Sequence, residues 1–129
     1  MGRHVVAALQ RAGIEALAGV RRAGSGPAEV AARVVDATDA GSLRAALEGV
    51  GAVVNAVAGD PATMARATEA VLAAAAPRRV VHLSSMAVYG PATGVVAEDA
   101  PLAPEGDYGE SKAASDRAVL AHVGRGGTR

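Results

Sequence analysis

Short valine-rich segments alternate with longer alanine-rich segments along the chain, and this alternation constrains the fold more than any other feature. The segments that we expect to form strands are Ile14–Val20, Ala32–Asp36, Gly51–Val57 and Arg79–Ser84. The segments with helical character are 3–11, 42–49, 61–76 and 107–123. Strands separated by single helices pair in parallel, so the sequence predicts an α/β fold with a doubly wound parallel sheet.

Capping residues mark where two of these helices begin. Asp39 or Ser42 can cap the second helix, and Asp60 can cap the third, where Pro61 follows at the first helical position. Between residues 86 and 106 the chain is rich in Gly, Pro and acidic residues, which predicts a long irregular loop before the last helix.

The composition fits one α/β domain over residues 1–129. Half of the residues are hydrophobic but none is Phe or Trp, so the core must consist of Val, Leu, Ile and Ala. The 13 basic residues balance the 13 acidic ones without a basic cluster, which argues against nucleic-acid binding. No apolar run is long enough to cross a membrane, and we expect a cytoplasmic protein.

A metal site is not expected. The chain has no Cys, and His4, His82 and His122 lack the spacing of metal ligands. His82 lies in a predicted strand, and we expect it to be a core residue.

Lys112 is the only lysine in the chain and follows Tyr108 by four residues in the string DYGESK. On a helix, residues with this spacing share a face, where an ammonium can favour the ionised form of a phenol. Proton transfer near neutral pH needs such help because the ordinary pKa of a tyrosine is about 10. Taken alone, the pair is better explained as a tyrosine at a helix N-terminus and a solvated lysine.

Three strings change that interpretation: VVNAVAG at 53–59, VVHLSSMAVYG at 80–90 and YGESK at 108–112. Together they resemble the extended branch of the short-chain dehydrogenase/reductase superfamily, the NAD(P)-dependent epimerase/dehydratase family, which acts largely on nucleotide sugars. The resemblance covers essentially the whole chain. It implies a Rossmann-like fold and hydride transfer at a secondary alcohol or ketone, with a nucleotide sugar as the favoured substrate class.

The resemblance also implies the catalytic residues. Tyr108 corresponds to the general acid/base, and Lys112 to the cation that supports it and bonds the nicotinamide ribose. Ser85 corresponds to the serine that bonds the reacting oxygen, with Ser84 as the fallback if the strand end is shifted by one residue.

Cofactor residues follow from the resemblance in the same way. Asp36 and Ala37 match the segment that meets the adenine, although Asp36 could equally close a turn. No acid stands at the end of the second predicted element, where Arg21 and Arg22 favour NADP over NAD, although such arginines are often only solvated charge. The small-residue stretch along which the cofactor would lie comprises Asn55, Ala56, Val57 and Ala58.

The chain departs from the family pattern at both ends. Gly2 matches the last glycine of the family's phosphate-binding turn, but the first strand and two glycines of that turn are missing. Residues 124–129 stop where the family enters its sixth strand and substrate region. We therefore expect a truncated protein, which a late start codon, a frameshift or a gene fragment would explain. We expect it to bind cofactor poorly. The two strands that would flank the missing first strand are expected to lack their common hydrogen-bonding partner.

Two alternatives to an enzyme stay open: a non-catalytic nucleotide-binding or interaction domain, and an inactive gene fragment. Retention of both Tyr108 and Lys112 favours the enzyme. Alanine-rich faces over 61–76 and 112–121 would also permit a homodimer.

Overall fold

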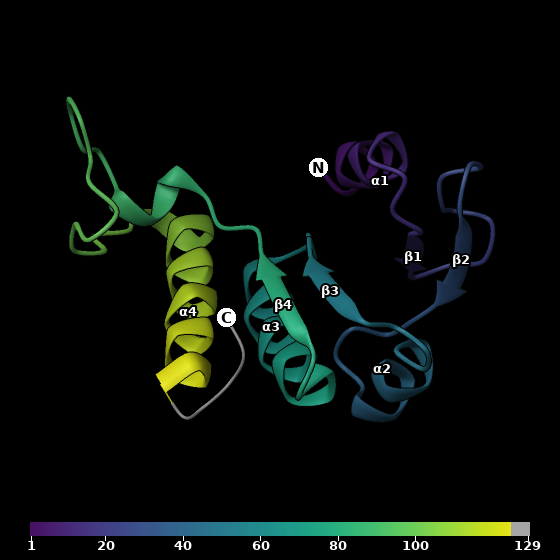
Figure 1. Ribbon diagram of the computed structural model, residues 1–129. Helices are drawn as coiled ribbons and strands as arrows, with labels where there is room; N and C mark the ends of the chain where they lie inside the picture. The colour runs from purple at the N-terminus through teal and green to yellow at the C-terminus, as the bar shows by residue number, and fades with distance from the viewer. Residues whose placement is uncertain (125–129) are drawn as a thin grey trace.

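The computed structural model describes residues 1–124 and confirms the alternation of strands and helices (Figure 1). The segment 125–129, where the approach to a further strand was expected, lies outside the described residues. The helices are α1 (Gly2–Arg11), α2 (Ala40–Ala46), α3 (Pro61–Ala75) and α4 (Gly106–Gly124). The strands are β1 (Leu17–Val20), β2 (Ala31–Val34), β3 (Ala52–Asn55) and β4 (Arg79–His82). A short 3₁₀ helix, η1 (Met86–Tyr89), interrupts the predicted loop.

The strands form two separate parallel pairs. β1 pairs with β2 from Leu17 opposite Ala31, and β3 pairs with β4, which ends with Asn55 opposite His82. Within residues 1–124, no strand joins β1 to β3. Figure 1 shows β1, β2 and α1 on one side of the molecule and β3, β4, α3 and α4 on the other.

The predicted capping residues begin α2 and α3. Asp39 accepts a hydrogen bond from the backbone N–H of Ser42 at 2.6 Å. Asp60 does the same for Thr63 at 3.0 Å, with Pro61 at the start of the helix. Each carboxylate satisfies an amide that has no partner within its helix, so these short polar contacts fix where the chain turns out of the preceding loop.

Small residues bring α3 and α4 close together. Ala67 and Ala75 of α3 and Ala113 of α4 are fully buried, and α3 also covers β3 and β4. The contact between the two helices includes a buried hydrogen bond from the Thr68 hydroxyl to the Ser115 hydroxyl at 3.3 Å. This compact unit holds the residues that follow β3 and β4, where the predicted site residues lie.

Among the described residues, none of the helices combines the length and the apolar character that a membrane span requires. The same residues include no group of three or more metal-ligating side chains that could hold a metal ion.

Candidate active site

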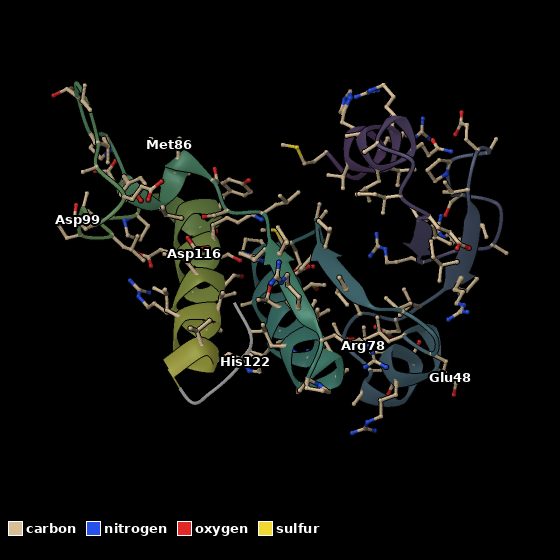
Figure 2. The ribbon with its side chains drawn as sticks, viewed as in Figure 1. Glu48, Arg78, Met86, Asp99, Asp116 and His122 are labelled. Atoms are coloured by element: carbon tan, nitrogen blue, oxygen red, sulfur yellow. The ribbon has the colours of Figure 1, made fainter. Side chains whose placement is uncertain are left out.

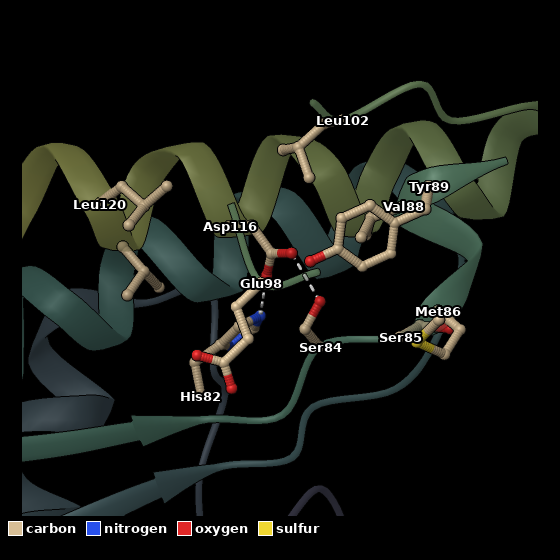
Figure 3. A pocket seen from close by; sticks show the side chains of 11 residues that line it. His82, Ser84, Ser85, Met86, Val88, Tyr89, Glu98, Leu102, Asp116 and Leu120 are labelled. Carbon is tan, nitrogen blue, oxygen red and sulfur yellow. Dashed lines mark hydrogen bonds and ion pairs between the residues drawn. The ribbon is translucent and has the colours of Figure 1, made fainter. Parts of the chain in front are cut away.

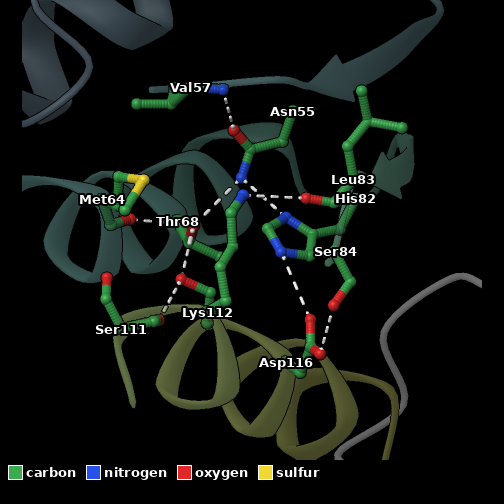
Figure 4. A network of polar contacts seen from close by, with 11 residues as sticks. Asn55, Val57, Met64, Thr68, His82, Leu83, Ser84, Ser111, Lys112 and Asp116 are labelled. Atoms are coloured by element: carbon green, nitrogen blue, oxygen red, sulfur yellow. Dashed lines mark hydrogen bonds and ion pairs between the residues drawn. The ribbon is translucent and has the colours of Figure 1, made fainter. Parts of the chain in front are cut away.

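Tyr108 and Lys112 lie on the first turns of α4, as their spacing predicts. Tyr108 is 52% exposed, whereas Lys112 is only 8% exposed. The Lys112 ammonium donates to the backbone carbonyl of Leu83, just after β4, at 3.0 Å (Figure 4). An ammonium has three N–H donors, so this buried cation keeps donors for another acceptor beside the end of β4.

Ser85 caps η1 and is held near the start of α4. Its hydroxyl oxygen accepts from the backbone N–H of Ala87 at 3.3 Å, so its own proton stays available for donation. The helix α4 approaches η1 closely at Gly109, where a Cβ atom would lie 2.8 Å from the carbonyl oxygen of Ala87. Only a glycine permits this approach, which brings the segment after Ser85 against the residue that follows Tyr108.

The neighbouring serine is engaged elsewhere. The Ser84 hydroxyl donates to Asp116 at 2.5 Å, and Asp116 lies on the side of α4 that faces β4 (Figure 2). A serine hydroxyl has one proton, so Ser84 cannot donate to a substrate while this bond persists. Of the two serines, Ser85 is therefore the one with a free donor.

Asp116 also faces His82, the last residue of β4. The Nε2 atom of His82 lies 3.4 Å from a carboxylate oxygen of Asp116, and the side chains are 7% and 17% exposed. On its other edge, His82 Nδ1 lies 3.1 Å from the amide nitrogen of Asn55, its partner in the register of β3 and β4. His82 is thus buried, as expected, but it belongs to a polar network and not to an apolar core.

The protonation of His82 is opposed by its surroundings. Burial lowers the pKa of His82 below its ordinary value of 6.5. The charge of Asp116 acts in the opposite direction, and that of Lys112 acts in the same direction as burial. The imidazole is accordingly neutral near physiological pH.

A cavity of about 560 Å³ opens beside β4 and α4 (Figure 3). Its polar lining comes from His82, Ser84, Ser85, Tyr89, Glu98 and Asp116, and its apolar lining includes Leu102 and Leu120. Apolar walls with a few convergent polar groups are typical of small-molecule sites. Of the predicted catalytic residues, Ser85 lines this cavity, whereas Tyr108 and Lys112 do not.

The residues expected to hold the adenine end of a cofactor follow β1 and β2. Arg21 and Arg22 are exposed directly after β1. Asp36, after β2, accepts from the backbone N–H of Thr38 at 2.8 Å and from its hydroxyl at 2.7 Å. These bonds from Thr38 lower the pKa of the exposed Asp36 carboxyl, with smaller contributions from Arg66 and Arg21. Asp36 therefore does close a turn. Both bonds use the same carboxylate oxygen, Oδ1.

Residues 55–58 follow β3, and Gly2 begins α1. Asn55 is 4% exposed, and the carbonyl oxygen of its side chain accepts from the backbone N–H of Val57 at 3.2 Å. Gly2 is exposed, and a Cβ atom there would meet nothing within 4 Å, so no described segment makes a close approach to it.

Sequence reasoning missed Asp116, which connects Ser84 to His82. A signal was available, because Tyr108, Lys112 and Asp116 follow one another at intervals of four residues, which places all three along one side of a helix. Thr68, which accepts from Asn55 at 3.1 Å, was also missed, and nothing in its sequence context distinguishes it from other helical threonines.

Parallel strands joined by helices, with serine, tyrosine and lysine after β4 and on α4, define a Rossmann-like α/β fold of the short-chain dehydrogenase type. The chain belongs to the NAD dependent epimerase/dehydratase family, whose profile matches residues 1–129.

Solved structures of this type resemble the chain over nearly its whole length. A protein of Burkholderia cenocepacia J2315, classed provisionally as an epimerase, is 32% identical with a TM-score of 0.81. MoeE5, solved with UDP-glucose and NAD, is 30% identical with a TM-score of 0.70. WbmG of Bordetella bronchiseptica, solved with NAD and UDP, is 26% identical with a TM-score of 0.74.

The three alignments cover 96%, 97% and 89% of this chain, respectively, but only 47%, 46% and 44% of the other proteins. The chain therefore spans about half the length of these structures. A comparison with curated proteins found no match.

Proposed function

We propose that this protein acts as an NAD(P)-dependent epimerase- or dehydratase-type oxidoreductase, which transfers hydride at a secondary alcohol or ketone of a nucleotide sugar. The observation that carries the proposal is the arrangement on α4: an exposed Tyr108 stands one turn from the buried ammonium of Lys112, which is held by the Leu83 carbonyl. A fixed cation beside an accessible phenol is what acid–base catalysis by tyrosine requires.

Four groups of residues fit a dinucleotide. Arg21 and Arg22 offer exposed positive charge, Asp36 offers an exposed carboxylate oxygen, and the small residues 56–58 allow close backbone approach. Lys112 offers unused N–H donors for ribose hydroxyls. When bound, the nicotinamide supplies the hydride exchange.

In this proposal the protein moves the proton. Tyr108 takes the proton from a substrate hydroxyl, or returns it to a carbonyl, as the reacting carbon is oxidised or reduced. Lys112 stabilises the phenolate form of Tyr108 during that exchange. Ser85 donates its free hydroxyl proton to the same substrate oxygen and orients it, whereas Ser84 stays bonded to Asp116.

The substrate class rests on both similarity and shape. MoeE5, which is 30% identical to this chain, was solved with UDP-glucose. WbmG, which is 26% identical, was solved with UDP. The cavity beside Ser84, Ser85 and Tyr89 has room for a hexose-sized ring. These observations support a nucleotide sugar over a larger or purely apolar ketone.

NADP is our proposed preference over NAD, although the solved complexes of MoeE5 and WbmG contain NAD. Arg21 and Arg22 stand where an acid would otherwise bind the ribose hydroxyls of NAD, and a basic residue suits the additional phosphate of NADP. The double variant R21A/R22A should weaken NADPH binding about tenfold and leave NADH binding nearly unchanged. Equal losses for both cofactors would show that the two arginines do not recognise the additional phosphate, and would overturn the proposed preference for NADP.

We also propose a homodimer, with one restriction. Ala67 and Ala75 of α3 and Ala113 of α4 are fully buried within one chain, so a second copy could use only the outward faces of these helices. Ala73 on α3 is exposed and is available for such a contact. Sedimentation of the wild type beside Ala73→Glu tests this, because a dimer formed there should dissociate.

The alternative is a domain that binds nucleotides without turnover. Both functions predict cofactor binding, so the decisive experiment couples a panel of UDP-sugars to the absorbance of reduced nicotinamide. Under our proposal the wild type turns over, and Tyr108→Phe abolishes turnover while it retains cofactor affinity. Cofactor binding without turnover of any sugar, by the wild type, would favour the alternative.

A further inference from the structure

We propose that His82 and Asp116 are positioning residues that fix the amide of Asn55, and through it the turn from Asn55 to Val57 beside which the dinucleotide is held. This inference rests on the proposed function, because it assigns a task to residues near the cofactor-binding stretch.

The orientation of the Asn55 amide is determined by a backbone donor. The N–H of Val57 can only donate, so the atom that it meets at 3.2 Å must be the carbonyl oxygen of the Asn55 side chain. The amide nitrogen therefore faces the opposite way, toward Thr68 at 3.1 Å and His82 at 3.1 Å (Figure 4). Both of its protons have an acceptor in this arrangement.

This orientation determines the tautomer of His82. Because the Asn55 nitrogen donates, Nδ1 of His82 must accept, and the single proton of the neutral imidazole lies on Nε2. Nε2 has no hydrogen-bond partner among the described residues, but it faces the Asp116 carboxylate at 3.4 Å, which favours a proton on that nitrogen. Asp116 is in turn oriented by the Ser84 hydroxyl.

The chain of contacts thus runs from α4 through β4 to the end of β3. A protonated His82 would break it, because Nδ1 would then carry a proton toward the Asn55 nitrogen, and two donors would face each other. The charged groups around the imidazole are Asp116 and Lys112 on α4, while Glu98 lines the same cavity. The side chains that reach this cluster from β3 and α3, Asn55 and Thr68, are neutral.

Two substitutions of His82 separate this role from a purely structural one. Asn at position 82 can place its carbonyl oxygen where Nδ1 accepts, and it cannot become protonated. Phe preserves a ring but offers no acceptor, which leaves a buried proton of Asn55 without a partner. Val71→Ala serves as the matched control, because Val71 is 5% exposed on α3 and belongs to the core, so its truncation lowers stability without changing this network.

The experiment measures NADPH and NADH affinity by fluorescence for the wild type and these three variants, at about pH 8 and at an acid pH where nitrogen NMR shows that the His82 imidazole is protonated. At the higher pH we expect H82N and V71A to match the wild type, and H82F to bind about tenfold more weakly. At the acid pH the wild type and V71A should lose affinity, whereas H82N should not. Equal affinity of H82F and the wild type, or the same acid loss in H82N, would overturn the positioning role.

Nitrogen NMR of the imidazole, recorded without cofactor, tests the network separately. A proton on Nε2 at about pH 8 supports it, and a proton on Nδ1 overturns it. If the wild type binds neither dinucleotide, the proposed function fails and the positioning role fails with it. If the wild type binds but the variants do not differ, only the positioning role fails.

Discussion

The ammonium of Lys112 and the backbone carbonyl of Leu83 are joined by a hydrogen bond of 3.0 Å that ties α4 to the residue after β4. Leu83 is itself tied to the neighbouring strand, because its N–H donates to the carbonyl of Asn55 at 3.1 Å. The proposed catalytic cation is therefore positioned by the sheet, and the helix that carries Tyr108 is fixed to the same point.

Replacement of Lys112 by Met should separate catalysis from stability. We expect kcat to fall by about 10²-fold or more, because no cation would support the Tyr108 phenolate. The free energy of unfolding should change by less than about 2 kcal/mol, since the buried ammonium is costly to desolvate and its loss offsets the lost bond. Arg117→Met, an exposed substitution on the same helix, is the control and should leave kcat unchanged. A K112M enzyme with full kcat would contradict the role of Lys112.

The two adjacent serines should differ in their effect on turnover. Ser85→Ala removes the free donor and should lower kcat about 10²-fold, in the range found for the loss of one transition-state hydrogen bond. Ser84→Ala removes the bond to Asp116 and should lower kcat much less. Steady-state kinetics with the active UDP-sugar gives the comparison, and a larger loss in S84A would move the catalytic assignment to Ser84.

Gly109→Ala should destabilise the fold. The added Cβ atom would lie 2.8 Å from the Ala87 carbonyl oxygen, so η1 and α4 would have to separate. We expect a loss of about 1–3 kcal/mol in urea denaturation, as for other overpacked positions. Gly51→Ala is the matched control, because no atom lies within 4 Å of its Cβ position. Equal stability of G109A and G51A would show that the contact between η1 and α4 is not tight in solution.

The stability of the protein should depend on pH through His82. Its pKa is lowered in the folded state by burial, while the unfolded chain has the ordinary value of 6.5. Below pH 6.5 the unfolded chain therefore takes up a proton before the folded one does, and stability falls as the pH decreases toward the folded-state pKa. Urea midpoints of the wild type and His82→Asn between about pH 8 and pH 5 measure this contribution, which H82N should lack.

Local signals in the sequence were sufficient for most of the fold. Asp60 and Pro61 define the start of α3, and the predicted end at residue 76 is within one residue of Ala75. The strand predicted over Arg79–Ser84 is shorter, because His82 is the last residue that pairs with β3. The 3₁₀ helix η1 was not predicted, since it depends on the Ser85 cap and on the contact between Gly109 and Ala87.

The site was only partly predictable for a physical reason. Tyr108 and Lys112 lie on one helix, so their four-residue spacing in the sequence is enough to predict that they share a face. The relation of Asp116 to Ser84 and His82 depends on how α4 packs against β4, which no local pattern encodes. The same holds for Asn55, whose register opposite His82 follows from strand pairing.

The separation of the strands into two pairs has a consequence for how the molecule opens. Among the buried apolar residues of the segment 1–124, Ala18 alone lies on α1, β1 or β2, whereas those from Met64 to Ala113 lie on α3, η1 and α4. The two halves thus differ in how many buried apolar residues stabilise them. Backbone amides should therefore exchange with solvent at two different rates, one for each half. The α1–β1–β2 half should open by local fluctuations, while β3, β4 and the two helices behind them keep their amides until the whole molecule unfolds.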